Sequence, residues 1–461
     1  MVVQHNMQAA NANRMLNITT GAQSKSTEKL SSGYRINRAA DDAAGLSISE
    51  KMRKQIRGLD KASSNAEDGV SSVQTAEGAL TEVHSMLQRM NELAVQASNG
   101  TNSDTDRGAI QDEISQLTTE IDRVAETTKF NETYLLKGGN GTKDVYMNGH
   151  DAGLKGTLTD SATTATFKVA AGALDAGKSV TIGGKDYTIG STKAEAKTFI
   201  GQAAKGNTVT IDGTTYTVIE DSGTEDTATN KLKLATIQGK IDDGSTVEYN
   251  GTKMTAMKDG DNNGVDDADS SVISAAHAVD LMEKELTAAN NIGATKTAAT
   301  AEKAADYTSK DGVTFNIKKG TAEVADKLSF SLHVGSDADM TNKITVDIET
   351  MNSSYLGIKG LNVNDDSGIA GTYAIDAISD ALQKVSEQRS SLGAVQNRLE
   401  HTIDNLDNVV ENTTTAESRI RDTDMAEEMV NYSKNNILAQ AGQSMLAQAN
   451  QANQGVLSLL Q

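Results

Sequence analysis

Apolar residues recur every three or four positions over long stretches near both ends of the chain, which places them in one stripe along a helix. The first stretch runs from Asp42 to Ser98, the second from Asp104 to Thr128 and the third from Tyr373 to Thr414. Helices of this length have no globular body to cover their stripes, so they bury them against one another. The pattern therefore predicts a long helical bundle or coiled coil built from both ends of the chain.

The chain of 461 residues contains no proline, although about 23 would be expected at the average usage of ~5%. Proline removes a helix hydrogen bond and clashes with the preceding turn, so its absence suits long unbroken helices. Aromatic residues make up only 3% of the chain. This composition argues against the large compact core of an enzyme.

Several classes of function are disfavoured by composition. The chain has no cysteine, which excludes disulfides and a thiol nucleophile. Its net charge of −20 argues against binding of nucleic acid. No apolar run approaches about 18 residues, so we expect no membrane insertion, and the first residues show no cleavable signal peptide. The six histidines are isolated and no H-E-x-x-H motif occurs, so we expect neither an enzyme nor a cofactor.

The two extremities carry weaker apolar stripes among many Asn, Gln, Ser and Ala residues. Isolated helices are marginally stable in water, so we expect both ends to remain disordered until a partner covers them. The alternative is that the two ends pair within one monomer. The C-terminal residues that we expect to pack against a partner are Met425, Met429, Leu438, Met445, Val456 and Leu460.

The middle of the chain differs from both ends in composition and pattern. It contains no arginine between Arg123 and Arg389 and is richer in Gly, Thr and Asp. Residues 179–189 (SVTIGGKDYTI) and 208–218 (TVTIDGTTYTV) are predicted to form two copies of one β-hairpin, turning at Gly-Gly and Asp-Gly. A looser third copy begins at Thr246.

Two further elements are predicted in this middle part. Residues 271–290 read as a helix, and residues 328–350 read as two strands joined by a polar turn. The predicted fold class is therefore mainly α at both ends, with an inserted β-rich (α+β) domain.

Four segments carry a resemblance to a known family. Residues Lys29–Leu59 and Glu77–Arg107 closely resemble the N-terminal signature of bacterial flagellins, and Ser391–Leu406 and Gln440–Gln461 resemble the C-terminal one. The match is colinear and occupies both ends of the chain. One departure is visible, because many flagellins have a proline in the stretch matching Ala449–Val456 and this chain has none.

The resemblance implies a division into three domains. Residues 1–40 and 420–461 resemble the inner coiled-coil domain of the filament subunit. Residues 41–139 and 326–419 resemble a helical core domain with a β-hairpin. Residues 140–325 resemble the variable outer domain, which is exposed to solvent.

The resemblance also implies a function. Such a chain is exported unfolded and polymerises at the tip of the extracellular flagellar filament, where it serves motility as a structural subunit. The expected partners are other copies of the chain, an export chaperone, and the cap and hook-junction proteins. The alternatives are a hook–filament junction protein, which shares flagellin-like ends, and a secreted adhesin that displays its β-rich middle on helical stalks.

A host protein is a further expected partner. Residues 88–96 (QRMNELAVQ) resemble the flagellin segment bound by the Toll-like receptor that senses flagellin. Carried over by position, the expected contacts are Gln88, Arg89, Leu93 and Glu113. Arg89 and Leu93 are four residues apart and so are expected on one helix face. The alternative is that these residues only pack against a neighbouring subunit.

An acidic loop and two sequons complete the sequence features. Residues 259–269 (DGDNNGVDDAD) place oxygen-bearing side chains as in an EF-hand calcium loop, but the twelfth position is Ser270 rather than Glu. A solvated acidic loop is therefore favoured over a metal site. Asn140 and Asn250 each begin an Asn-Gly-Thr sequon, a weak signal for glycosylation.

Overall fold

The computed structural model describes residues 6–365 and 368–459 of the chain. The chain divides into two compact units. The terminal unit consists of Met1–Ser71, Ser331–Thr345 and Val395–Gln461, and the central unit consists of Ser72–Phe330 and Val346–Ala394. Two long helices, α2 (Ala43–Ala97) and α8 (Ile369–Arg421), contribute residues to both units.

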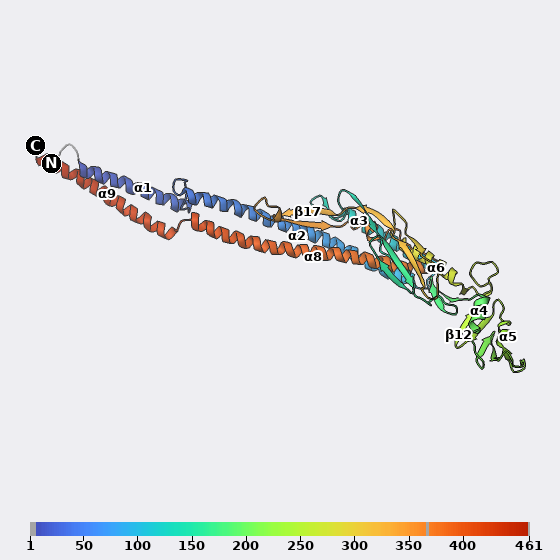
Figure 1. Ribbon diagram of the computed structural model, residues 1–461. Helices are drawn as coiled ribbons and strands as arrows, with labels where there is room; N and C mark the ends of the chain where they lie inside the picture. The colour runs from blue at the N-terminus through green and yellow to red at the C-terminus, as the bar shows by residue number, and fades with distance from the viewer. Residues whose placement is uncertain (1–5, 366–367, 460–461) are drawn as a thin grey trace. The chain divides into compact units, whose positions relative to one another are not determined.

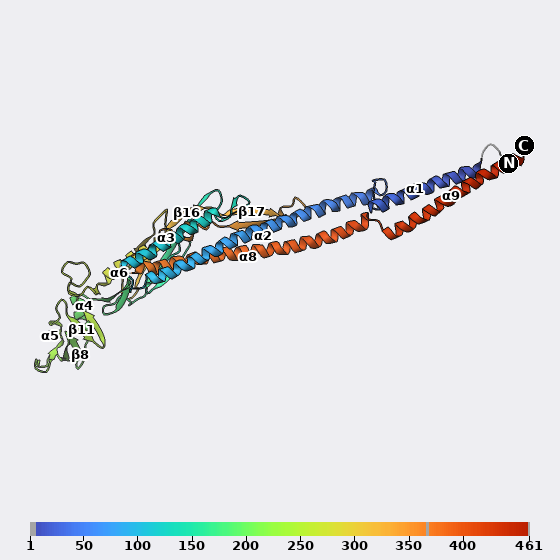
Figure 2. The ribbon, with the colours of Figure 1, turned by 180° about the vertical axis from the view of Figure 1, so that it is seen from behind.

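The terminal unit is built from antiparallel helices. Helix α1 (Met7–Ser32) lies along α9 (Met425–Leu459), and the first part of α2 lies along the last part of α8 (Figures 1 and 2). Asn6 caps α1 by accepting a hydrogen bond from the Ala9 amide, and Gly33 ends it with a φ of +76°, as glycine does at many helix C-termini.

The core of the terminal unit is a narrow seam. It consists of small clusters of buried residues rather than one thick core: Leu59, Ala62 and Leu406, then Ala66, Val334, Ile344 and Leu399. The end of a two-stranded sheet, β17 (Leu328–His333) and β18 (Lys343–Ile348), covers this seam. A Cβ at Gly69 would lie 2.2 Å from Leu332, so glycine allows the hairpin to lie directly on α2.

The helical part of the central unit combines α3 (Asp104–Thr127) with the adjoining portions of α2 and α8. A capping box between Ser103 and Asp106 begins α3. The α2 stripe is fully buried here, with no exposed surface at Val73, Ala76, Leu80, Val83, Leu87, Met90 and Ala94. Three short elements accompany the helices: the pair β1 (Lys129–Phe130) and β2 (Thr133–Tyr134), the pair β3 (Thr142–Tyr146) and β16 (Thr321–Ala325), and helix α7 (Ser353–Leu356).

A second core joins two sheets to one helix. Helix α6 (Ala275–Asn290) packs against both sheets, and its buried residues share a core with Phe167 and Phe315. The antiparallel sheet has the order β14 (Thr300–Lys303), β15 (Val313–Lys318), β5 (Thr164–Val169), β4 (Thr157–Asp160). The mixed sheet has the order β13 (Val272–Ile273), β7 (Lys185–Ile189), β6 (Ser179–Ile182).

A third core belongs to a five-stranded sheet with two short helices, α4 (Lys193–Ile200) and α5 (Leu234–Gln238). Its strand order is β10 (Lys231–Lys233), β9 (Thr214–Ile219), β8 (Thr208–Ile211), β11 (Thr246–Tyr249), β12 (Thr252–Thr255). The β8–β11 pair at its centre is visible in Figure 2.

Most of the elements predicted from the sequence are confirmed. The three long helices begin within four residues of their predicted starts, although α8 extends further to Arg421. All three predicted hairpins form, and each has positive φ at both turn residues: Gly183 and Gly184, Asp212 and Gly213, Asn250 and Gly251. The helix predicted over 271–290 begins later, because Val272 and Ile273 form strand β13 and Ser274 then caps α6. The division into three domains stays a prediction.

The partly buried carboxylate of Asp376 makes the stability of the central unit depend on pH. Burial raises the pKa of Asp376 on α8, nearby Asp151 and Asp380 raise it further, and His150 opposes them. A raised folded-state pKa means that the charged form costs stability above that pKa, and this cost disappears as the pH falls below the ordinary carboxyl range. We therefore expect Asp376→Asn to raise the melting temperature of the central unit at pH 7 but not at pH 3.5, as measured by calorimetry. An equal increase at both pH values would contradict this assignment.

Candidate assembly surface

The pairing of α1 with α9 is fixed at both of its ends. Asn6 donates its side-chain amide to the Ala449 carbonyl at 3.1 Å. At the other end Lys29 lies 3.7 Å from the Glu428 carboxylate. These contacts hold the two extremities of the chain together as one antiparallel pair.

The segment after α1 is tied to the junction between α8 and α9. Tyr34 forms an antiparallel bridge with Asp422, and the Arg35 amide donates to the Arg421 carbonyl at 2.7 Å. The guanidinium of Arg421 lies 4.9 Å from the centre of the Tyr34 ring, and that of Arg53 lies 5.8 Å from it. Such cation–π contacts favour a fixed geometry at this junction.

Large apolar side chains remain exposed on this helix pair. In the part of α1 and α9 whose side chains are described, which ends at Gln451, only Ser26 and Ala439 are buried. The exposed large apolar residues are Met7, Met15, Ile18, Met425, Met429, Val430, Ile437, Leu438 and Met445. Burying one such side chain fully contributes about 1.5–3 kcal/mol. The helix pair therefore presents exposed apolar side chains that stabilise an assembly when another protein covers them.

Two of the most exposed residues on this surface were not singled out from the sequence. Val430 and Ile437 each leave 67% of their surface exposed. Their spacing of seven residues, one heptad, is the signal that could have identified them. The predicted residues Met425, Met429, Leu438 and Met445 are exposed, whereas Val456 and Leu460 lie outside the residues whose side chains the structure describes.

Over the described residues, the two extremities form helices that pack against each other, as in the alternative of pairing within one monomer. Each helix covers one side of the other in this arrangement. That both ends are disordered before assembly stays a prediction. Pairing still leaves the outward apolar residues uncovered, so the need for a further partner remains.

The residues expected to contact a receptor lie on α2 and α3 in the central unit. Arg89 donates to Glu113 at 2.9 Å and to Glu92 at 3.1 Å, and Gln88 lies 3.1 Å from a ring nitrogen of His84. The hydrogen bonds with Glu113 and Glu92 raise the pKa of Arg89, so its charge is secure. Gln88, Arg89 and Glu113 thus form a polar surface that joins the two helices.

Leu93 does not share this surface, in contrast to the expectation that it lies on one face with Arg89. Its side chain is only 2% exposed. A stripe of the same helix is buried at Leu87, Met90 and Ala94, and Leu93 belongs to that buried side. Leu93 therefore supports α2 from within, and a partner that binds beside Arg89 cannot reach it without displacing the packing.

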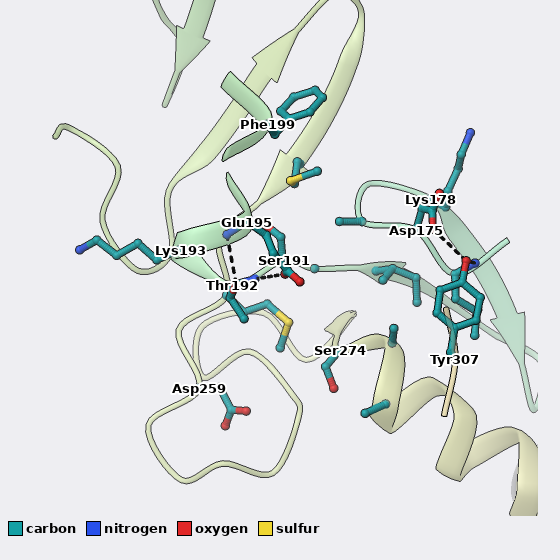
Figure 3. Close-up of a pocket in the computed structure, with 18 of the residues that line it drawn as sticks. Asp175, Lys178, Ser191, Thr192, Lys193, Glu195, Phe199, Asp259, Ser274 and Tyr307 are labelled. Carbon is teal, nitrogen blue, oxygen red and sulfur yellow. Dashed lines mark hydrogen bonds between the residues drawn. The ribbon is translucent and has the colours of Figure 1, made fainter. Parts of the chain in front are cut away.

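A cleft of about 1100 Å³ lies elsewhere in the central unit (Figure 3). On its wall, Tyr307 donates to Asp175 at 2.8 Å and accepts from the Leu174 amide, and burial raises the pKa of this tyrosine. Opposite, Thr192 and Glu195 form the capping box of α4. Each wall of the cleft is thus tied by its own hydrogen bonds, between Tyr307 and Asp175 on one side and between Thr192 and Glu195 on the other.

The acidic loop near this cleft forms a series of tight turns. Asp259 accepts hydrogen bonds from the Asn263 and Gly264 amides at 3.0 and 2.9 Å, and Asn263 accepts from the Val265 amide. Within residues 6–365 and 368–459, no group of three or more His, Cys, Asp or Glu side chains is placed to hold a metal ion. In the same described part of the chain, no helix has the length and apolar character needed to cross a membrane.

Comparison with known proteins gives matches at both ends and along the whole chain. Residues 3–141 match the family model for the bacterial flagellin N-terminal helical region, and residues 375–460 match that for the C-terminal helical region. A flagellin of Clostridium tyrobutyricum is 40% identical over an alignment of 461 residues, and this alignment covers 98% of this chain and 100% of that protein. A flagellin of Bacillus subtilis is 36% identical and is matched over 100% of both chains.

A solved structure of the flagellar junction protein from Legionella pneumophila was also found. It covers 81% of this chain and 99% of its own, with 14% identity and a TM-score of 0.32. A score at this level supports no conclusion, so the relationship rests on the sequence matches.

Proposed function

The chain belongs to the bacterial flagellins, and we infer that the exposed apolar surface of α1 and α9 is where one copy packs against the next in the flagellar filament. Flagellins are structural proteins that polymerise into the extracellular filament, and this chain is a structural subunit of that kind. Its matches extend over whole flagellins rather than over the ends alone, which favours this function over a junction protein or an adhesin.

The observation that carries the inference is the set of uncovered side chains on the paired terminal helices. Met7 is 70% exposed and Ile437 67% exposed, although both lie on helices that are already packed together. The apolar contribution to assembly therefore comes from covering these residues with neighbouring copies. A head-to-tail contact of this kind repeats as an open helix rather than closing as a dimer.

The proposed arrangement keeps three domains. Residues 1–40 and 420–461 form the inner layer, 41–139 and 326–419 the helical core layer, and 140–325 the outer layer. Support comes from the exposed apolar surface on α1 and α9 and from the strand-rich character of the middle. We further propose that the chain is exported unfolded, with a chaperone, and is added beneath a cap on a filament that begins at hook-junction proteins, as expected for its family.

The function is tested by adding the purified chain to short filament seeds and following seed length by electron microscopy. Elongation supports a polymerising subunit. Seeds that keep their length under conditions in which flagellin from a relative elongates its own seeds would overturn the proposal.

We also propose that the host Toll-like receptor for flagellin binds the surface formed by Gln88, Arg89 and Glu113. Arg89 is the main candidate because it is charged, exposed, and positioned by two carboxylates. Arginine is over-represented among the residues that dominate binding at protein interfaces. Leu93 contributes here only by supporting α2.

Replacement of Arg89 by alanine is expected to weaken receptor binding about tenfold, because it removes the central charge and leaves Glu92 and Glu113 without their partner. Binding of the monomer to the receptor ectodomain is measured by surface plasmon resonance. Arg123→Ala is the matched control, since Arg123 on α3 is also exposed and bound to a nearby glutamate, Glu120. Equal loss in both variants would indicate a general charge effect and contradict a specific site.

A further inference from the structure

The strand-rich part of the central unit contains three copies of one structural unit. The three hairpins, β6–β7, β8–β9 and β11–β12, share the same register: Ser179 faces Thr188, Thr208 faces Thr217, and Thr246 faces Thr255. Each first strand buries its second residue, and each turn has two residues with positive φ. The duplication suggested by the sequence is therefore a threefold repeat of the backbone.

The repeat extends beyond the hairpins. At the same position of each second strand a short parallel segment joins it: Ile273 beside Ile189, Leu232 beside Val218, and Ser191 beside Ala256. Each segment leads directly into a helix, and α6, α5 and α4 begin at Ala275, Leu234 and Lys193, in each case two residues after the paired residue. Each unit thus consists of a hairpin, a parallel strand and a helix.

Two of the three units pair with each other. Strands β8 and β11, the first strands of their hairpins, are antiparallel neighbours with Val209 facing Tyr249, Thr210 facing Glu248 and Ile211 facing Val247. Thr210 and Glu248 occupy the same position in their respective hairpins. The register is therefore symmetric about this pair, as in an isologous contact between two copies.

Within residues 6–365 and 368–459, the third unit has no such partner. Among the residues that the structure describes, β6 is the last strand of its sheet and pairs only with β7. The Ile189 amide donates to the Lys178 carbonyl at 2.8 Å. Along an antiparallel strand, every second residue directs its backbone N–H and C=O toward the same neighbour. Lys178 faces β7 in this way, so the backbone groups of Ser179 and Thr181 point away from β7. Both residues are exposed. This edge is therefore accessible to another strand.

We propose that β6 pairs with β6 of a second copy of this chain, antiparallel and centred on Thr181 facing Thr181 of the partner subunit. Thr181 is the third residue of its strand, as Thr210 is in β8 and Glu248 in β11. The proposed contact between two chains therefore has the same register as the β8–β11 pair within one chain. The proposed register places Val180 opposite Ile182 of the partner subunit, as Val209 and Ile211 lie opposite Tyr249 and Val247. The occupant suited to this edge is thus a copy of the same hairpin.

A strand of four residues offers few hydrogen bonds, so this contact is weak between free monomers. Subunits held in one filament have an effective concentration of about millimolar when their attachment permits contact. The inference rests on the filament function, and it predicts pairing between subunits beyond the α1–α9 surface. The pairing is closed, so each β6 strand joins one other.

The experiment uses the absence of cysteine from the full chain. Filaments grown from Thr181→Cys are oxidised under mild conditions and analysed by non-reducing electrophoresis. Facing residues of an antiparallel hydrogen-bonded pair have Cα atoms about 5.5 Å apart, which is within the range of a disulfide. We expect covalent dimers in at least several-fold higher yield than in the two control variants.

The first control is Thr210→Cys, the equivalent position on a strand whose edge is already filled by β11. The second is Asp186→Cys, which faces Thr181 across the same hairpin and would lie about 15 Å from its counterpart, because neighbouring strands are about 4.8 Å apart. Dimer yields from Thr181→Cys no higher than from Asp186→Cys overturn the proposal.

Filament length by electron microscopy separates this inference from the function on which it rests. Filaments that form without Thr181→Cys dimers exclude the β6 pairing and leave the filament function intact. Failure of the unmodified chain to form filaments overturns the function itself, and oxidation of concentrated Thr181→Cys monomers then decides the pairing. Thr181→Cys removes the hydrogen bond that the Thr181 hydroxyl donates to Asp186 at 2.6 Å. Because both side chains are exposed, we expect only a small change in the melting temperature of the variant.

Discussion

Deletion of residues 441–461 is expected to abolish elongation of filament seeds while the central unit remains folded. The deletion removes the second half of α9, including the exposed Met445, and the hydrogen bond that joins Asn6 to Ala449. Without that half, α1 loses its partner over the same length, and isolated helices of this size are marginal in water. The deletion thus removes Met445 from the assembly surface and leaves the first part of α1, which carries Met7, without its helical partner.

The central unit should not respond to this deletion, because it contains none of the deleted residues. Its buried sheets and α6 depend on contacts among residues of the same unit. Thermal unfolding followed by near-ultraviolet circular dichroism tests this, since most tyrosines lie in that unit. Seeds that elongate normally with the truncated chain would refute the proposed role of the terminal helices.

The sequence was sufficient to predict elements whose signals are local. The long helices follow from apolar spacing, because a stripe over many turns has few alternatives. The hairpins follow from alternation around Gly-Gly, Asp-Gly and Asn-Gly, because only residues that tolerate positive φ form such two-residue turns. In each case the residues that carry the signal are close together in the chain.

The features missed by the sequence depend on distant residues. Strand β13 is two residues long and exists because it pairs in parallel with β7, more than 80 residues earlier. Strand β3 pairs with β16, which follows it by about 175 residues; neither strand has a strong pattern of its own. Tertiary pairing of this kind fixes a strand only after the surrounding core has formed.

The candidate sites show the same division. Met425, Met429, Leu438 and Met445 of α9 could be predicted because a polar helix with an apolar stripe needs a partner, whereas Val430 and Ile437 lie off the stripe that was predicted from the sequence. The burial of Leu93 could not, since a spacing of four residues defines a helix face only approximately when the buried stripe is broad. Arg89 and Leu93 lie on either side of the boundary between the exposed and the buried surface of α2.

Replacement of Phe315 by alanine is expected to lower the free energy of unfolding of the central unit by about 3–5 kcal/mol. Phe315 on β15 faces Phe167 on β5 in the strand register, their ring centroids are 6.3 Å apart, and both side chains are fully buried. The chain has only five phenylalanines and no tryptophan, and Phe167 and Phe315 are the two phenylalanines of this core. Natural domains have about 5–15 kcal/mol of stability, and the loss is therefore a large share of the total.

Urea unfolding of the full chain measures this loss, with Tyr146→Ala as the matched control. Tyr146 lies on β3 of the same unit but is 42% exposed, so its truncation should change stability by no more than about 0.5 kcal/mol. Because α1 and α9 belong to the other unit, Phe315→Ala should still elongate seeds at temperatures where the sheets begin to unfold. A loss of stability below about 1 kcal/mol, close to that of the control, would mean that the two aromatic rings do not form the centre of this core. If seed elongation is lost in parallel with unfolding, filament growth depends on the strand-rich region as well as on the terminal helices.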